Sequence, residues 1–187
     1  GPAIRALALN YVRANGKPAT MPRMNRWWKP LSGQLSLNVD ASFTEESYSG
    51  SCGAVIRDHL GSFVAASTAK LEYAADIVAA EAAALVEGLK LALQLGIDSL
   101  LIQMDNLIVV ESLKSNSGHS MVVAPILDEC RNLMEDFGKV EVEHCKREST
   151  MVAHILAQEG RMEPPSLWMD TPPEFLSVAL VDDVSIL

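Results

Sequence analysis

The sequence predicts one α/β domain with a five-stranded mixed sheet, three antiparallel strands first, and helices flanking the sheet. Two observations predict this arrangement. Three short segments with alternating apolar residues come first and are joined by tight turns, as in antiparallel strands. A long helical segment rich in Ala and Leu follows, and two further apolar strands then alternate with helices. Strands that are linked through helices add to a sheet in parallel, so a mixed sheet with helices on its faces is expected.

The three N-terminal strands are marked by period-two alternation and by the turns between them. In residues 34–43, QLSLNVDASF, apolar Leu35, Leu37 and Val39 alternate with polar neighbours. Residues 45–50, EESYSG, form a turn. Residues 51–71 then contain two strands around RDHLG, where Gly61 suits a tight hairpin. We expect Asp40 at the end of the first strand, on the face opposite to the apolar side chains.

The remaining elements alternate between helical and strand patterns. The helix over 74–97 is the strongest in the chain, and Gly96 stands where a helix C-terminus favours glycine. The expected elements after it are a strand over 99–105, a helix over 106–115, a helix over 122–137 closed by Gly138, a strand over 139–148, and a final helix over 149–161 capped by Ser149 or Thr150.

Charge and composition divide the chain into three parts. Residues 1–29 carry six basic and no acidic side chains and are expected to be a basic linker, in which Gly1 and Pro2 resemble the remnant of tag cleavage. Residues 30–160 form the domain. Residues 161–187 have two Pro-Pro pairs and five acidic side chains against one basic, so they are expected to be an acidic, Pro-rich tail that either packs locally or leaves the domain.

The composition limits the location and the partners of the protein. The apolar runs are far shorter than the roughly 20 residues of a membrane span, and no secretory signal is visible. The three cysteines, Cys52, Cys130 and Cys145, are widely spaced and odd in number, which favours a reducing compartment; we expect the nucleus or the cytoplasm. The net charge is −9, and beyond residue 29 there are nine basic against 24 acidic residues. Such an acidic body binds nucleic acid weakly unless metal ions or a local basic patch contribute.

Three acidic residues stand in apolar surroundings on separate elements. They are Asp40 in the first strand, Glu81 in the long helix and Asp105 after the fourth strand. The first and fourth strands are expected to be neighbours, and the helix packs across them, so the three carboxylates can meet. Such a cluster either raises the pKa values of its members or binds cations. Oxygen ligands suit Mg²⁺, and two such ions about 4 Å apart can assist phosphoryl displacement. Asp105 could instead cap the helix that follows it.

Five segments in a consistent order resemble the ribonuclease H superfamily, and most of all the ribonuclease H-like domain of plant non-LTR retroelements and their domesticated relatives. The segments are LSLNVDASF, SGSCGAVIRDHLGSFVAA, AAEAAALVEGLKLALQLGI, LLIQMDNLIVVESL and VEHCKRESTMVAHILA. The resemblance covers about residues 27–187. It implies a metal-dependent nuclease that cuts the RNA strand of RNA–DNA hybrids, with two Mg²⁺ or Mn²⁺ ions if active. By motif, Asp40 corresponds to the acid that bridges both ions, and Glu81 and Asp105 to two further acids.

The chain departs from the family pattern at its fourth acid. The expected motif N-x-x-A-D-x-L-A reads TMVAHILA here, so Thr150 replaces Asn and His154 replaces Asp. A neutral imidazole favours Mn²⁺ or Zn²⁺ over Mg²⁺ and brings no negative charge. His154 is therefore assigned to the catalytic and metal site with Asp40, Glu81 and Asp105, as an assisting residue. The alternative function is a domesticated, catalytically impaired module that binds a protein or nucleic acid.

Other residues have two interpretations each. Trp27 and Trp28 could stack on bases, or could pack the linker onto the domain. Arg57 and the pair Lys146 and Arg147 could touch phosphates. His59, His119 and His144 are expected in a turn, a loop and on a strand surface, respectively.

Overall fold

The computed structural model describes residues 27–115 and 121–184. The strands are β1 (Leu35–Thr44), β2 (Ser49–Arg57), β3 (Phe63–Leu71), β4 (Ser99–Met104), β5 (Lys139–His144) and β6 (Ser166–Met169). The helices are α2 (Ile77–Gln94), α3 (Leu107–Lys114), α4 (Ala124–Met134), α5 (Met151–Met162) and α6 (Ser177–Val184), with short 3-10 turns η1 (Arg147–Thr150) and η2 (Glu174–Leu176). Residues 1–26 of the predicted basic linker lie outside the described residues.

The sheet is mixed, and its strand order is β5-β4-β1-β2-β3-β6. β1, β2 and β3 are antiparallel neighbours, and β4 and β5 continue the sheet in parallel with β1. The prediction of three antiparallel strands followed by helix-linked parallel strands is therefore confirmed. The predicted number of five strands is wrong, because β6 pairs antiparallel with the edge strand β3. β6 has only four residues and follows a Pro-Pro pair, so its alternation is too short to distinguish it from an extended tail.

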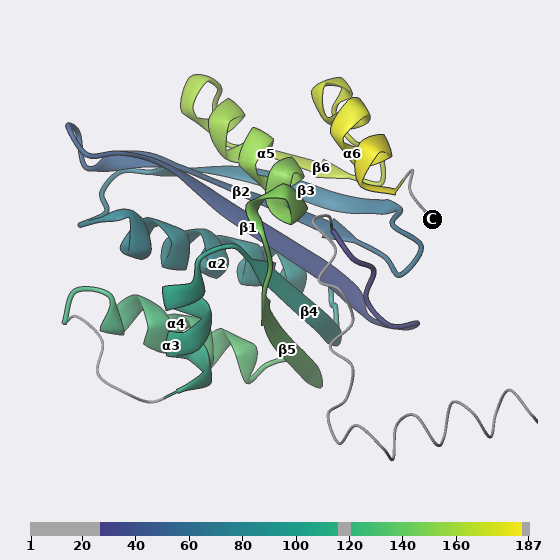
Figure 1. Cartoon of the computed structure of the whole chain (residues 1–187), viewed down its shortest axis with the longest axis horizontal. Helices are drawn as coiled ribbons and strands as arrows, with labels where there is room; N and C mark the ends of the chain where they lie inside the picture. The colour runs from purple at the N-terminus through teal and green to yellow at the C-terminus, as the bar shows by residue number, and fades with distance from the viewer. Residues whose placement is uncertain (1–26, 116–120, 185–187) are drawn as a thin grey trace, which may run out of the picture.

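Helices cover both faces of the sheet, with α5 and α6 on one side and α2, α3 and α4 on the other (Figure 1). Small residues allow close packing on each face. On the α2 side, an added Cβ at Gly88 would lie 2.6 Å from Val39, so the helix backbone rests directly on β1. On the α5 side, an added Cβ at Gly53 of β2 would overlap backbone atoms of Ala153 and Ala157. This packing fixes the positions of α2 and α5, the two helices that carry Glu81 and His154.

A polar network joins both ends of the described chain to the sheet. Arg57 is fully buried, and its guanidinium lies 3.9 Å from the ring centroid of Trp27. It donates to Asp183 of α6 at 2.7 Å and to Asn38 of β1 at 2.9 Å. The interpretation that Arg57 touches phosphates is wrong, because no part of its side chain reaches the surface. Trp27 is 3% exposed and packs on the domain, which favours packing over base stacking for this residue.

The region beyond residue 160 is packed against the domain over its described part. β6 extends the sheet, Leu176 of η2 is buried in a cluster with Val55 and Leu156, and α6 reaches Arg57 through Asp183. The acidic, Pro-rich segment was expected either to pack locally or to leave the domain. These contacts show that its described part packs locally. None of the helices in the described ranges combines the length and apolarity required to cross a membrane.

Candidate metal-binding active site

Asp40 lies at the middle of β1, and the prediction that it ends the strand is wrong, because β1 continues to Thr44. Pairing with β2 extends along the whole strand and sets Asp40 opposite Gly53. Pairing with β4, in contrast, stops at Asn38 and Gln103. β1 therefore has a free edge beside Asp40, and Asp105 follows β4 at the same register, two residues after Gln103. The end of β4 creates an opening in the sheet in which the two aspartates lie close together.

Asp105 is free to face this opening because the next residue caps α3. The Asn106 side chain accepts a hydrogen bond from Val109 N at 3.1 Å, which satisfies one of the free N–H groups of the helix N-terminus. Asn106, and not Asp105, is therefore the N-cap of α3. Asp105 remains partly exposed, whereas Asp40 is almost fully buried.

Glu81 approaches the two aspartates from α2. The helix begins at an N-cap, Asp76, whose side chain accepts from Ala79 N at 2.8 Å. Glu81 is 5% exposed, and the small alanines on either side of it let the helix lie close to β1. Its carboxylate accepts a hydrogen bond from the backbone of Ala41. One of its oxygens, Oε2, is buried without a hydrogen-bond partner.

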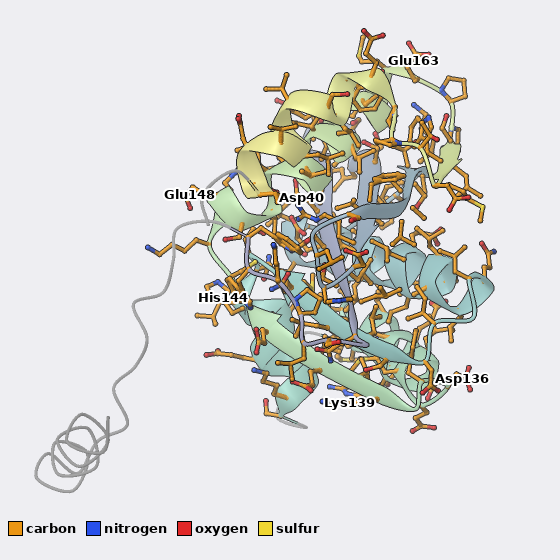
Figure 2. The ribbon with its side chains drawn as sticks, turned by 90° about the vertical axis from the view of Figure 1, so that its right-hand side faces the viewer. Asp40, Asp136, Lys139, His144, Glu148 and Glu163 are labelled. Atoms are coloured by element: carbon orange, nitrogen blue, oxygen red, sulfur yellow. The ribbon has the colours of Figure 1, made fainter. Side chains whose placement is uncertain are left out.

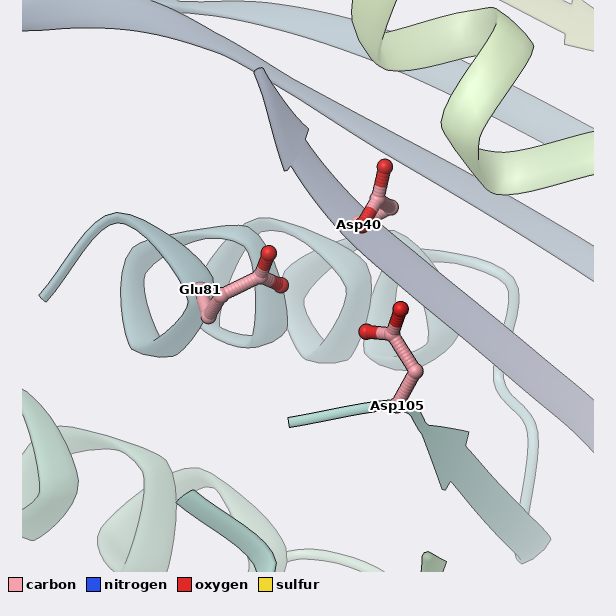
Figure 3. Close-up of side chains that lie close together, drawn as sticks. All are labelled: Asp40, Glu81 and Asp105. Carbon is pink, nitrogen blue, oxygen red and sulfur yellow. The ribbon is translucent and has the colours of Figure 1, made fainter. Parts of the chain in front are cut away.

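The three carboxylates form one compact group. One oxygen from each of Asp40, Glu81 and Asp105 lies within 4.8 Å of the others, and the side chains point toward one another (Figure 3). Burial raises the pKa of Glu81 to about 9, and the negative charges of the two aspartates act in the same direction. Burial also raises the pKa of Asp40, although the hydrogen bond from His154 opposes that shift. Without a cation, burial and the neighbouring charges therefore favour the protonated form of Glu81.

The group has the donor set of a hard divalent cation. All of its ligand atoms are carboxylate oxygens, as Mg²⁺ and Mn²⁺ prefer. The buried and unpartnered Oε2 of Glu81 is an additional argument, because such an oxygen is costly unless a cation or a donor reaches it. The residues present thus fit a divalent ion, whose identity they leave open.

His154 lies beside the group without joining it. It projects from α5, and its Nδ1 lies 2.7 Å from Oδ2 of Asp40. It does not belong to the set of atoms within 4.8 Å of one another. Of the four residues assigned from the sequence, the structure brings three acids together and places His154 in contact with Asp40.

Two residues near the group were not assigned to the site from the sequence. His144 ends β5, and its Nε2 lies 3.1 Å from the backbone oxygen of Asp105. From the sequence, His144 was expected on a strand surface, without this contact. The parallel register that pairs His144 with Met104 could have indicated that it lies near Asp105. Arg147 of η1 is exposed, and its positive charge acts on Asp40 in the direction that lowers the pKa of that carboxyl. Figure 2 shows His144, Glu148 and Asp40 toward the same side of the domain.

Several solved structures with the same fold are ribonucleases H. RNase H1 from the halophilic archaeon Halobacterium salinarum superposes with a TM-score of 0.64 at 21% identity, covering 68% of this chain and 96% of that one. The N-terminal RNase H domain of Rv2228c from Mycobacterium tuberculosis gives a TM-score of 0.63 at 21% identity, covering 69% and 94%. LC11-RNase H1, solved in complex with an RNA/DNA hybrid and isolated from compost by a metagenomic approach, gives 0.62 at 18% identity, covering 69% and 97%.

Sequence comparison identifies the family directly. No match was found among curated protein sequences. The sequence profile of the family described as reverse transcriptase-like matches residues 38–160, which include all four residues assigned to the site. This match spans well over half of the chain, and the structural neighbours have the fold expected for it. The chain therefore belongs to the reverse transcriptase-like family and has a ribonuclease H-like fold.

Proposed function

We propose that this protein is a metal-dependent ribonuclease that hydrolyses the RNA strand of RNA–DNA hybrids. One observation carries the proposal: three carboxylates from three separate elements meet at the open edge of β1, with oxygens within 4.8 Å of one another. Without cations the ionised form of such a group is unfavourable, because like charges at this distance repel and burial disfavours each of them.

Each acid has a distinct part in holding the cation. Asp40 and Asp105 present carboxylates from adjacent strands, and Glu81 presents its unpartnered oxygen from the opposite side. A divalent ion bound there supplies positive charge, which lowers the pKa of a bound water and stabilises charge on the phosphate oxygens. The rigid sheet and α2 hold the ligands in place, so little reorganisation is needed when a substrate binds.

The fold and the location of the group support an RNA–DNA hybrid as the substrate. LC11-RNase H1, which shares this fold, was solved in complex with an RNA/DNA hybrid. In this chain, recognition would depend on backbone shape and on the 2′-hydroxyl groups of RNA. The positive charge of Arg147 acts on Asp40, so this residue is placed to contact a phosphate near the group. With a net charge of −9, binding by this chain is expected to be weak and sensitive to salt.

The test is cleavage of a labelled RNA–DNA hybrid with Mg²⁺ and, separately, with Mn²⁺. Asp40→Asn keeps the size of the side chain but removes its charge, and we expect it to slow cleavage by about 100-fold or more. Asp136→Asn is the matched control, because Asp136 is exposed at the far end of the domain from Asp40 (Figure 2). Equal cleavage rates in the wild type and Asp40→Asn would contradict the proposal. So would cleavage that persists after EDTA treatment.

The second candidate function is a non-catalytic interaction module. Two observations favour it: His154 replaces an acid of the family pattern, and α6 exposes the apolar side chains Val178 and Val181 at 73% and 61%. A groove with Glu148, Met151 and Phe175 in its walls runs between α5 and α6. This function predicts no cleavage with either metal ion, and no rise in melting temperature when Mn²⁺ is added.

A further inference from the structure

His154 contacts the oxygen of Asp40 that points away from Glu81 and Asp105. Nδ1 lies 2.7 Å from Oδ2 of Asp40, at the distance of a charge-assisted hydrogen bond. Figure 3 shows one carboxylate oxygen of Asp40 directed toward Glu81 and Asp105 and the other directed away from them, toward the helix that carries His154. Asp40 therefore has one oxygen for the acid group and one for the imidazole.

The proton in this contact excludes an ion from the same place. When Asp40 is ionised, as a metal ligand must be, its Oδ2 can only accept a hydrogen bond, and the His154 tautomer that fits this contact has its proton on Nδ1. A nitrogen that bears a proton has no lone pair with which to bind a metal ion. The two ring nitrogens of an imidazole point in divergent directions, so the lone pair on Nε2 faces away from Asp40. His154 in this position blocks Oδ2 and offers no ligand beside it.

The charge of the acid group leads to the same result. Asp40, Glu81 and Asp105 carry three negative charges when ionised, and one divalent ion neutralises most of that charge. A second ion about 4 Å away would require a bridging carboxylate and at least one further anionic ligand. In this chain His154 stands where the family pattern has that further acid. Its imidazole is neutral or positive, so it does not attract a cation.

We propose that the acid group holds one divalent cation and that His154 occupies the place of a second. This inference rests on the proposed function, since it concerns the same group. It differs from what the resemblance implies, which is two ions bridged by Asp40. The substitution of one residue thus converts a two-ion site into a one-ion site, in which His154 holds the outer oxygen of Asp40.

The experiment counts bound Mn²⁺ ions by the electron paramagnetic resonance signal of the free ion. Wild type is compared with His154→Asp, which restores a carboxylate beside Asp40. His59→Asp is the matched control, because it makes the same change beyond the end of β2, away from the acid group. Circular dichroism melts with and without Mn²⁺ show whether each variant folds. The melts give a second readout, because the added carboxylate of His154→Asp repels Asp40 until ions bind.

We expect one ion in the wild type and in His59→Asp, and two ions in His154→Asp. We also expect Mn²⁺ to raise the melting temperature of His154→Asp more than that of the wild type. Two ions in the wild type would overturn the inference while leaving the proposed function intact. One ion in a folded His154→Asp would also overturn it, because His154 would then not be what excludes the second ion. The absence of any bound ion in the wild type would overturn both the inference and the metal dependence of the proposed function.

Discussion

Arg57 in β2 and Asp183 in α6 form an ion pair across 126 positions of the sequence, with Nη1 and Oδ2 separated by 2.7 Å. The Arg57 side chain is fully buried, and that of Asp183 is 8% exposed. α6 itself buries none of its residues completely, so this pair anchors the helix to the sheet. Removing one partner leaves an uncompensated buried charge, which costs more than the pair contributes.

We therefore expect Asp183→Asn to lower the free energy of unfolding by about 3 kcal/mol or more. Urea denaturation followed by circular dichroism measures it. The exposed Asp136→Asn should change the same quantity by less than about 0.5 kcal/mol. The double variant Arg57→Met with Asp183→Leu should recover most of the loss, because it removes both charges and fills the space. A loss in Asp183→Asn no larger than that of the control would refute the anchoring role.

The raised pKa of Glu81 makes the stability of the metal-free protein depend on pH. Its ordinary value is 4.5, and burial raises it to about 9 in the folded chain. Below pH 4.5 both states are protonated, and the contribution of Glu81 to stability is fully present. Between pH 4.5 and 9 the unfolded chain releases a proton that the folded chain keeps, so the free energy of unfolding falls as the pH rises.

Urea denaturation in EDTA at about pH 5, 7 and 9 measures this slope. Glu81→Gln cannot titrate, so we expect it to be more stable than the wild type at the highest pH and to have a shallower slope. A residual slope is expected from Asp40, whose pKa is also raised. Identical slopes in the two proteins would show that Glu81 is not protonated in the folded state.

Arg147 should contribute to binding of the hybrid rather than to folding. It is exposed, and its charge acts on Asp40, so a phosphate bound near the acid group would lie within its reach. We expect Arg147→Gln to weaken binding and to reduce the salt slope of the logarithm of the affinity by about one. Fluorescence anisotropy with a labelled hybrid at several salt concentrations measures both. The control Lys139→Gln removes a charge at the opposite end of β5 from His144 (Figure 2), and equal effects of the two variants would exclude a local role for Arg147.

Gly53 should be essential for the position of α5. A side chain at this residue would overlap backbone atoms of Ala153 and Ala157, so Gly53→Ala must push the helix away from β2. We expect a loss of about 1 to 3 kcal/mol in the free energy of unfolding, the range of overpacked cores. Gln158→Ala on the exposed face of α5 is the control and should be nearly neutral.

The displacement should also disturb the contact of His154 with Asp40, which opposes the rise in the pKa of that carboxyl. NMR titration of the Asp40 carboxyl in Gly53→Ala should therefore give a higher pKa than in the wild type. An unchanged pKa would mean that α5 keeps its position despite the added methyl group.

Much of the fold was predictable because it depends on local patterns. Alternation in β1, the helical composition of α2 and the order of the elements indicated the mixed sheet and the adjacency of β1 and β4. The meeting of the three acids was predictable from the adjacency of β1 and β4 and from the packing of α2 across them, although the place of Asp40 within β1 was not. β6 could not be predicted, because four residues after a Pro-Pro pair are too few to display a period.

The sequence by itself determined the identity of the acids and the elements that carry them. Tertiary structure alone decided that β4 ends beside Asp40, that Glu81 is buried with an unpartnered oxygen, and that His154 contacts Asp40 without joining the acid group. It also decided that Arg57 is buried beside α6. From its charge alone, Arg57 was expected at the surface. The physical reason is that desolvation and hydrogen bonding depend on contacts between elements far apart in sequence, which local periodicity does not encode.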